Sequence, residues 1–158
     1  REVSGVENST PEMFIGANYI VTPTKKNTPE AIKACIQLGK VLGFHRVRTL
    51  SVEEHDEMIA FVSQLTHCIA VSLMTCSDTE GLETFTGDSF RDLTRIANIN
   101  EIMWTELFLD NREALLHEMN LFEKQFNKLK TVLEQGDAEE MKKIMRKSSE
   151  RRRKFDKE

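Results

Sequence analysis

Apolar side chains between Trp104 and Leu133 recur mainly at alternating steps of four and three residues. This spacing is close to the 3.5-residue period of a helix that packs along one seam against another helix. Its members are Trp104, Phe108, Leu115, Met119, Phe122, Phe126, Leu129 and Leu133. A seam of this length needs a partner helix, so we expect a mainly α-helical fold in which this stretch is core and oligomer interface.

A second helical run precedes the seam and begins with Ser51-Val52-Glu53-Glu54, which has the Ser-x-x-Glu spacing of a capping box. Apolar residues then recur three and four positions apart, at Met58, Phe61, Leu65, Ile69, Leu73 and Cys76. The pattern predicts one long central helix that runs from Ser51 to about Ser77.

Between these two runs, residues 77–87 hold turn-forming side chains without a clear period and read as a loop. A short helix should follow and reach Ala97, with Asp88 or Ser89 as its N-cap. Residues 98–100 break that helix, and Asn100 can cap the one that carries the seam.

The last helix is predicted to begin at Asp137, after Gly136 ends the seam, and to run toward Phe155. Its end is strongly basic, with Arg146, Lys147, Arg151, Arg152, Arg153 and Lys154. Such an end can bind nucleic acid or an acidic partner. We favour a solvated helix terminus, where cations are stabilised by the negative end of the helix dipole.

The first fifty residues differ in composition from the rest of the chain, because they hold all three of its prolines. Residues 18–22 form a β-branched and aromatic run that predicts a short strand. A helix should begin at Thr28 and end at Gly43, and residues 44–50 can form a second strand. We therefore predict two domains: residues 1–50 as a small β-α-β remnant of a Rossmann-like domain, and residues 51–158 as an all-helical domain.

The formal net charge of −4 argues against duplex DNA or an anionic membrane surface as a partner. We find no apolar run near the roughly 20 residues that span a bilayer and no leader peptide, so we expect a cytoplasmic protein. Cys35, Cys68 and Cys76 lack a Cys-x-x-Cys spacing and read as reduced, partly buried thiols. We expect no metal site, because the four histidines lack the close pairing of zinc ligands.

Two residue groups can carry chemistry. Arg91 and Arg95 lie one helical turn apart beside Asp92, where guanidinium groups can hold a carboxylate or form a surface ion pair. Ser63 and His67 lie on adjacent turns of the central helix and can point into one cleft or be a packed pair. Asp56 is too far from His67 for a catalytic triad, roughly 16 Å along the helix axis.

The segment 88–97, Asp-Ser-Phe-Arg-Asp-Leu-Thr-Arg-Ile-Ala, followed by Met103-Trp104, resembles the substrate-binding motif of prephenate dehydrogenases. The resemblance implies that Arg95 grips a carboxylate of prephenate, and that Asp92 and Trp104 line or support the same pocket. Residues 63–67 resemble the Ser-His-Leu-Pro-His segment of that family at the first, third and fifth positions, which adds Ser63 and His67 to the site. Gln64 and Thr66 depart from the family pattern. His55-Asp56 also fits a family pair, to which we assign a structural role.

Residues 1–5 resemble those that follow the His-Pro-x-Ala-Gly motif of the family. The catalytic histidine is therefore expected upstream of Arg1, with no catalytic residue in this chain. Glu2 matches an acidic residue that helps to organise the pocket. The sequence has no Gly-x-Gly-x-x-Gly, so NAD, or NADP, is expected to be bound mainly by a missing N-terminal domain. The resemblance further implies an intertwined homodimer with substrate between the helical and cofactor domains.

The implied reaction is the oxidative decarboxylation of prephenate to 4-hydroxyphenylpyruvate in tyrosine biosynthesis, with hydride transfer to NAD. The isolated chain is expected to be inactive but dimeric. Two alternatives stay open: an arogenate dehydrogenase, which shares the fold and motif, and a non-catalytic helical dimerisation module in which Arg95 and Asp92 only pair on the surface.

Overall fold

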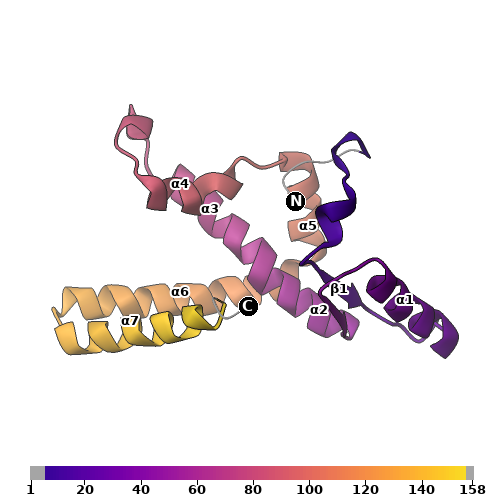
Figure 1. The fold of residues 1–158 in the computed structure, drawn as a ribbon. Coiled ribbons are helices and arrows are strands. Elements are labelled where there is room, and N and C mark those ends of the chain that lie inside the picture. The colour runs from indigo at the N-terminus through magenta and orange to yellow at the C-terminus, as the bar shows by residue number, and fades with distance from the viewer. Residues whose placement is uncertain (1–5, 156–158) are drawn as a thin grey trace. The chain divides into compact units, whose positions relative to one another are not determined.

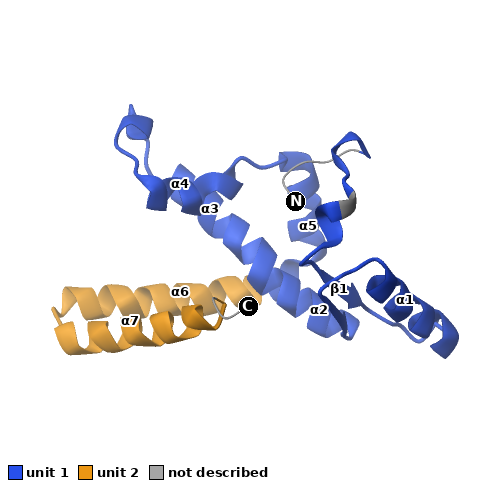
Figure 2. Cartoon of the chain, viewed as in Figure 1, with its two compact units in different colours: residues 1–115 blue, residues 116–158 orange. Residues whose placement is uncertain are grey.

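The computed structural model describes residues 6–155, and within this range the chain is mainly helical, as predicted (Figure 1). The strands and helices are β1 (Asn18–Val21), α1 (Pro29–Val41), β2 (Arg46–Thr49), α2 (Val52–Ile59), α3 (Leu65–Thr75), α4 (Asp88–Thr94), α5 (Glu101–Asp110), α6 (Arg112–Glu134) and α7 (Ala138–Arg152). The chain divides into two compact units, residues 1–115 and 116–158 (Figure 2). The predicted division at residue 50 stays a prediction.

The first elements form the predicted β-α-β unit, in which β1 and β2 pair in parallel from Asn18 with Arg46 to Val21 with Thr49. The helix between them starts as expected, because the Thr28 side chain accepts a hydrogen bond from the Ala31 N–H. Gly43 follows the helix end with φ +78°, a left-handed conformation that glycine adopts without steric cost. Local sequence signals therefore place both ends of α1.

The apolar positions of α1, which we expect from the sequence to form one buried stripe at Ile32, Cys35, Ile36, Gly39 and Leu42, are mostly not buried, so this expectation is wrong. Gly39 is buried, Ile32 and Ile36 are half-buried, and Cys35 and Leu42 are exposed. The reason is that a sheet of only two strands covers little of one helix face. What it does cover is tightly packed, because a Cβ placed on Gly39 would lie 2.6 Å from Cδ1 of Tyr19.

Gly39→Ala is expected to destabilise the chain by up to about 2 kcal/mol. Overpacking against Tyr19 costs about 1–3 kcal/mol, and the better helix propensity of alanine offsets about 1 kcal/mol of that cost. In a Tyr19→Ala background the same change should stabilise the chain, because the clash is gone. Urea unfolding of the two variant pairs measures the sign. An equal destabilisation in both backgrounds would show that the Tyr19 contact does not set the requirement for glycine.

The central helical run begins with the predicted capping box. The Ser51 side chain accepts from the Glu54 N–H, and the Glu54 side chain accepts from the Ser51 N–H. The run continues without interruption to Thr75. It contains one feature that the sequence did not predict, a π-turn over Ala60–Gln64, in which the Leu65 N–H donates to the Ala60 carbonyl five residues back. A π-turn adds one residue to a helical turn and is frequent at functional sites.

Two expectations for the following helices are wrong. Helix α4 has Gly87 as its N-cap without a side-chain cap, rather than Asp88 or Ser89. The apolar seam is not one helix, because α5 ends at Asp110 and α6 begins at Arg112. The cap by Asn100 is confirmed, since its side chain accepts from the Met103 N–H.

The second unit is a pair of helices, the larger part of α6 and all of α7 (Figure 2). The Asp137 side chain accepts from the Glu140 N–H, which confirms the predicted start of α7. Lys128 on α6 donates to Glu140 Oε1 at 3.1 Å, and Lys143 lies 3.3 Å from Oε2. The hydrogen bond from Lys128, followed by that from Lys143, lowers the pKa of Glu140. This contact links the two helices at their exposed side.

The core of the first unit is small. Ala60, Leu65 and Leu115 are buried together, and Cys68, Ile69, Phe108 and Ala114 pack around them. Burial raises the pKa of the Cys68 thiol. All three cysteines are free thiols, but Cys35 and Cys76 are exposed rather than partly buried. Many large apolar side chains remain exposed in the single chain, among them Met58, Phe61 and Val62 on the central run.

This exposure matters for one sequence expectation. The helical run Val52–Thr75 is long and apolar enough to cross a membrane, with a mean hydropathy of 1.6 over 18 residues. The statement that no apolar run approaches a spanning length is therefore wrong. In a single copy only 22% of that window is buried. A core helix that another protein surface covers can have the same length and composition as this run. The absence of a membrane partner stays a prediction.

Candidate functional site

The predicted pair Ser63 and His67 lies on the central helical run, with Ser63 inside the π-turn and His67 one turn later on α3. His67 Nδ1 lies 2.8 Å from the backbone oxygen of Ser63. Because a carbonyl oxygen only accepts, Nδ1 donates, and Nε2 of the neutral ring is left as an acceptor. The two residues thus meet through the Ser63 backbone rather than through its hydroxyl group.

Trp104 on α5 stacks on His67, with ring centroids 3.7 Å apart and an angle of 29° between the planes. Phe108, one turn further along α5, packs against Trp104 at 5.4 Å. All three rings are half-buried. The structure therefore brings together two of the predicted site residues that are far apart in the sequence, and it builds an aromatic cluster between α3 and α5.

Arg95 and Asp92 lie on the segment between the loop and α5. Asp92 is on α4, and Arg95 opens the short 3₁₀ helix Arg95–Ala97. Both side chains are exposed. Helix α4 and the 3₁₀ helix each pack against α3, the helix that carries His67. Glu2, the remaining predicted site residue, lies outside the described residues.

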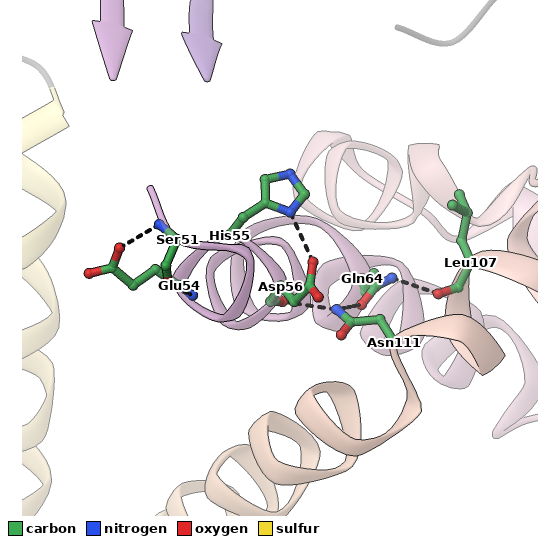
Figure 3. Close-up of polar contacts among 7 residues, drawn as sticks. All are labelled: Ser51, Glu54, His55, Asp56, Gln64, Leu107 and Asn111. Carbon is green, nitrogen blue, oxygen red and sulfur yellow. Dashed lines mark hydrogen bonds and ion pairs between the residues drawn. The ribbon is translucent and has the colours of Figure 1, made fainter. Parts of the chain in front are cut away.

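A polar cluster that the sequence did not predict joins the two sides of this site (Figure 3). Gln64, only 4% exposed, donates from Nε2 to the Leu107 carbonyl at 2.8 Å. Asn111 donates from Nδ2 to Gln64 Oε1 and to the Asp56 carbonyl, each at 2.9 Å. The departure of Gln64 from the family pattern was the available signal, but its partners are distant in the sequence.

The other pairings are local. His55 Nδ1 lies 2.9 Å from Asp56 Oδ1, at the start of the central run (Figure 3). This contact is compatible with the structural role predicted for the pair. Among residues 6–155, no three His, Cys, Asp or Glu side chains lie close enough together to hold a metal ion.

Comparison with known proteins gives the family of this chain. The family model for the prephenate dehydrogenase dimerization domain matches residues 51–147. This chain belongs to the prephenate dehydrogenase family. Prephenate dehydrogenase of Bacillus subtilis (strain 168) is 33% identical over 143 residues, which cover 87% of this chain and 38% of that protein. Cyclohexadienyl dehydrogenase of Zymomonas mobilis is 28% identical, over 87% of this chain and 50% of that protein.

Solved structures of the prephenate dehydrogenase family share the fold. That of the Aquifex aeolicus enzyme in complex with hydroxyphenyl propionate and NAD+ has a TM-score of 0.90 and 32% identity, and the match covers 98% of this chain and 56% of that one. Synechocystis arogenate dehydrogenase has a TM-score of 0.79 at 22% identity, over 91% of this chain and 54% of that one, which shows the fold alone. The chain thus spans about half, or less, of the length of these relatives.

The β1–α1–β2 unit does not have the features of a dinucleotide cradle. A Rossmann cradle uses a glycine-rich turn between a strand and the following helix, so that backbone N–H groups approach the pyrophosphate. Here residues 22–28 join β1 to α1 and contain Pro23 but no glycine. We therefore assign no cofactor contact to this unit.

Proposed function

We propose that this chain is the C-terminal portion of an NAD-dependent prephenate dehydrogenase, which oxidatively decarboxylates prephenate to 4-hydroxyphenylpyruvate. In this proposal the chain binds the substrate carboxylate and provides a homodimer interface, while another part of the protein binds NAD. The observation that carries it is the stack of Trp104 on His67, on a helix that also packs against the segment of Arg95. Family membership supports the reaction class. We also propose a cytoplasmic location, as is usual for soluble biosynthetic enzymes.

Each residue of the site has a distinct task in the proposal. The Arg95 guanidinium, a planar fork of donors, holds a substrate carboxylate. Nε2 of His67 can accept a hydrogen bond from a substrate hydroxyl group, and the aromatic surface with Trp104 offers an apolar wall to the ring. Asp92 and Ser63 support the pocket, and Glu2 helps to organise it. Fixing substrate in this way lowers the barrier by restricting its motion before reaction.

The homodimer part of the proposal rests on exposed apolar surface. Helical side chains such as Phe61 and Val62 are 56% and 52% exposed in the single chain. Removal of such apolar surface from water favours association. The matching family domain is described as a dimerization domain, which supports a second copy of this chain as the cover.

The experiment has two readouts. Sedimentation equilibrium of the 158-residue chain should give twice its mass of 18.2 kDa. The same chain with prephenate and NAD should give no absorbance increase at 340 nm above a blank. A protein that carries a dinucleotide-binding domain ahead of this chain should give a clear rate, and arogenate offered in parallel separates the two dehydrogenase activities. A monomer, or no rate from the longer protein with either substrate, would contradict the proposal.

A further inference from the structure

Gln64 is a buried polar side chain whose hydrogen bonds all go to one neighbouring segment. Its amide nitrogen binds the Leu107 carbonyl, and its amide oxygen receives the Asn111 amide. Both amide hydrogens of Asn111 find an acceptor, Gln64 Oε1 and the Asp56 carbonyl. At a buried position such a satisfied network is stronger than at the surface, and breaking one link leaves costly unpaired groups.

The network sits where two helices have irregular ends. Leu107 lies in the last turn of α5. Gln64 is the last residue of the π-turn. One side chain on the central run therefore binds the last turn of α5, and Asn111, which separates α5 from α6, binds that side chain and the Asp56 carbonyl on α2.

Two contacts between the central run and α5 lie side by side. Gln64 meets Leu107, and His67, three residues later, meets Trp104, three residues earlier on α5. Residues three apart lie one above the other on a helix face. Because the two segments cross in opposite directions, the hydrogen bond fixes the register in which the rings can stack.

We propose that Gln64 and Asn111 are positioning residues, which hold the end of α5 on the π-turn and thereby keep the Trp104 ring on His67. The consequence for substrate binding rests on the proposed function, whereas the effect on the ring stack does not. Without the two amides, α5 can slide or rotate on the central run, and the stack of Trp104 on His67 is lost.

Trp104 is the only tryptophan in the chain, so its fluorescence reports the stack directly. His67→Leu provides the unstacked reference. Gln64→Leu and Asn111→Ala are each expected to shift the Trp104 emission to longer wavelength, toward that reference, because water reaches the uncovered indole face. In the His67→Leu background, Gln64→Leu should add little further shift. The matched controls Gln37→Leu on α1 and Asn120→Ala on α6, both exposed, should leave the emission unchanged.

A further variant, Gln64→Glu, tests the proposal if Gln64→Leu folds poorly. In Gln64→Glu the introduced carboxyl can donate to the Leu107 carbonyl only when protonated, and burial favours the protonated form. Emission should therefore be close to that of the unsubstituted chain at acid pH and shift as pH rises. It is read as the difference from the unsubstituted chain at each pH, with far-UV circular dichroism as the check on folding.

The fluorescence measurements contain no substrate, so their outcomes test the positioning role independently of the proposed function. Wild-type emission in folded Gln64→Leu and Asn111→Ala, or no pH-dependent difference in Gln64→Glu, would overturn the positioning role. In the longer, catalytically active protein, Gln64→Leu should raise KM for prephenate. If the emission shifts while KM stays unchanged, Gln64 still positions the rings, but the rings do not bind the substrate.

Discussion

Arg95→Ala is expected to raise KM for prephenate roughly 10- to 100-fold in a protein that contains this chain and carries out the reaction. A hydrogen bond to a charged group contributes about 1.5–3 kcal/mol, and each 1.4 kcal/mol is about tenfold in affinity. Arg95→Lys keeps the charge but loses the fork geometry, so it should recover only part of the affinity. Steady-state kinetics over a range of prephenate concentrations measures the effect.

Arg91→Ala is the matched control for this experiment. Arg91 lies one turn earlier on α4, and its Nε donates to Thr86 Oγ1 at 3.3 Å, within its own segment. Its loss should leave KM nearly unchanged. Equal effects of the two substitutions on KM would indicate that positive charge in general attracts the substrate, rather than a specific contact between Arg95 and its carboxylate. An unchanged KM in Arg95→Ala would favour the reading in which Arg95 and Asp92 only pair on the surface.

Helix starts could be predicted from the sequence because they depend on neighbours within one turn. Thr28, Ser51, Asn100 and Asp137 all accept the backbone N–H bonds expected of N-cap residues. These contacts join residues three positions apart, so no tertiary structure is needed to form them. The exception is α4, where Gly87 takes the N-cap position without a side-chain bond.

The break at Asn111 and the π-turn could not be predicted, because each depends on a distant partner. The apolar repeat skips one position at Asn111 but resumes in phase at Leu115, so periodicity alone indicates one helix. In the structure Asn111 binds the Asp56 carbonyl and Gln64, both on the central run. A tertiary contact of this kind overrides local propensity, and a sequence pattern contains no sign of it.

The residues of the candidate site stay predictions, and their contacts could not be predicted from the sequence. The spacing of Ser63 and His67 indicated one helical face, and the family resemblance added Trp104 and Arg95. The sequence could not show that His67 binds the Ser63 backbone and stacks on Trp104, since ring contacts depend on how α5 crosses α3. The resemblance also marked Gln64 only as a departure, whereas the structure gives its amide a partner at each end.

Leu65→Ala is expected to cost about 2–5 kcal/mol of the free energy of unfolding, the usual range for a leucine truncated in a packed core. Leu65 is 4% exposed and packs with Ala60 and Leu115 in the small core of the first unit. Few other buried side chains are present there to fill the cavity. Urea unfolding at fixed protein concentration measures the loss, since association also stabilises the folded chain.

Leu109→Ala provides the comparison, because Leu109 on α5 is 63% exposed in the same unit. Its truncation removes little buried surface from the single chain and should cost less than about 1 kcal/mol. A large loss that falls as protein concentration rises would mean that a second copy covers Leu109, and would support the proposed homodimer. Similar, concentration-independent losses in both variants would contradict a core centred on Leu65, because burial within the chain would then not decide stability.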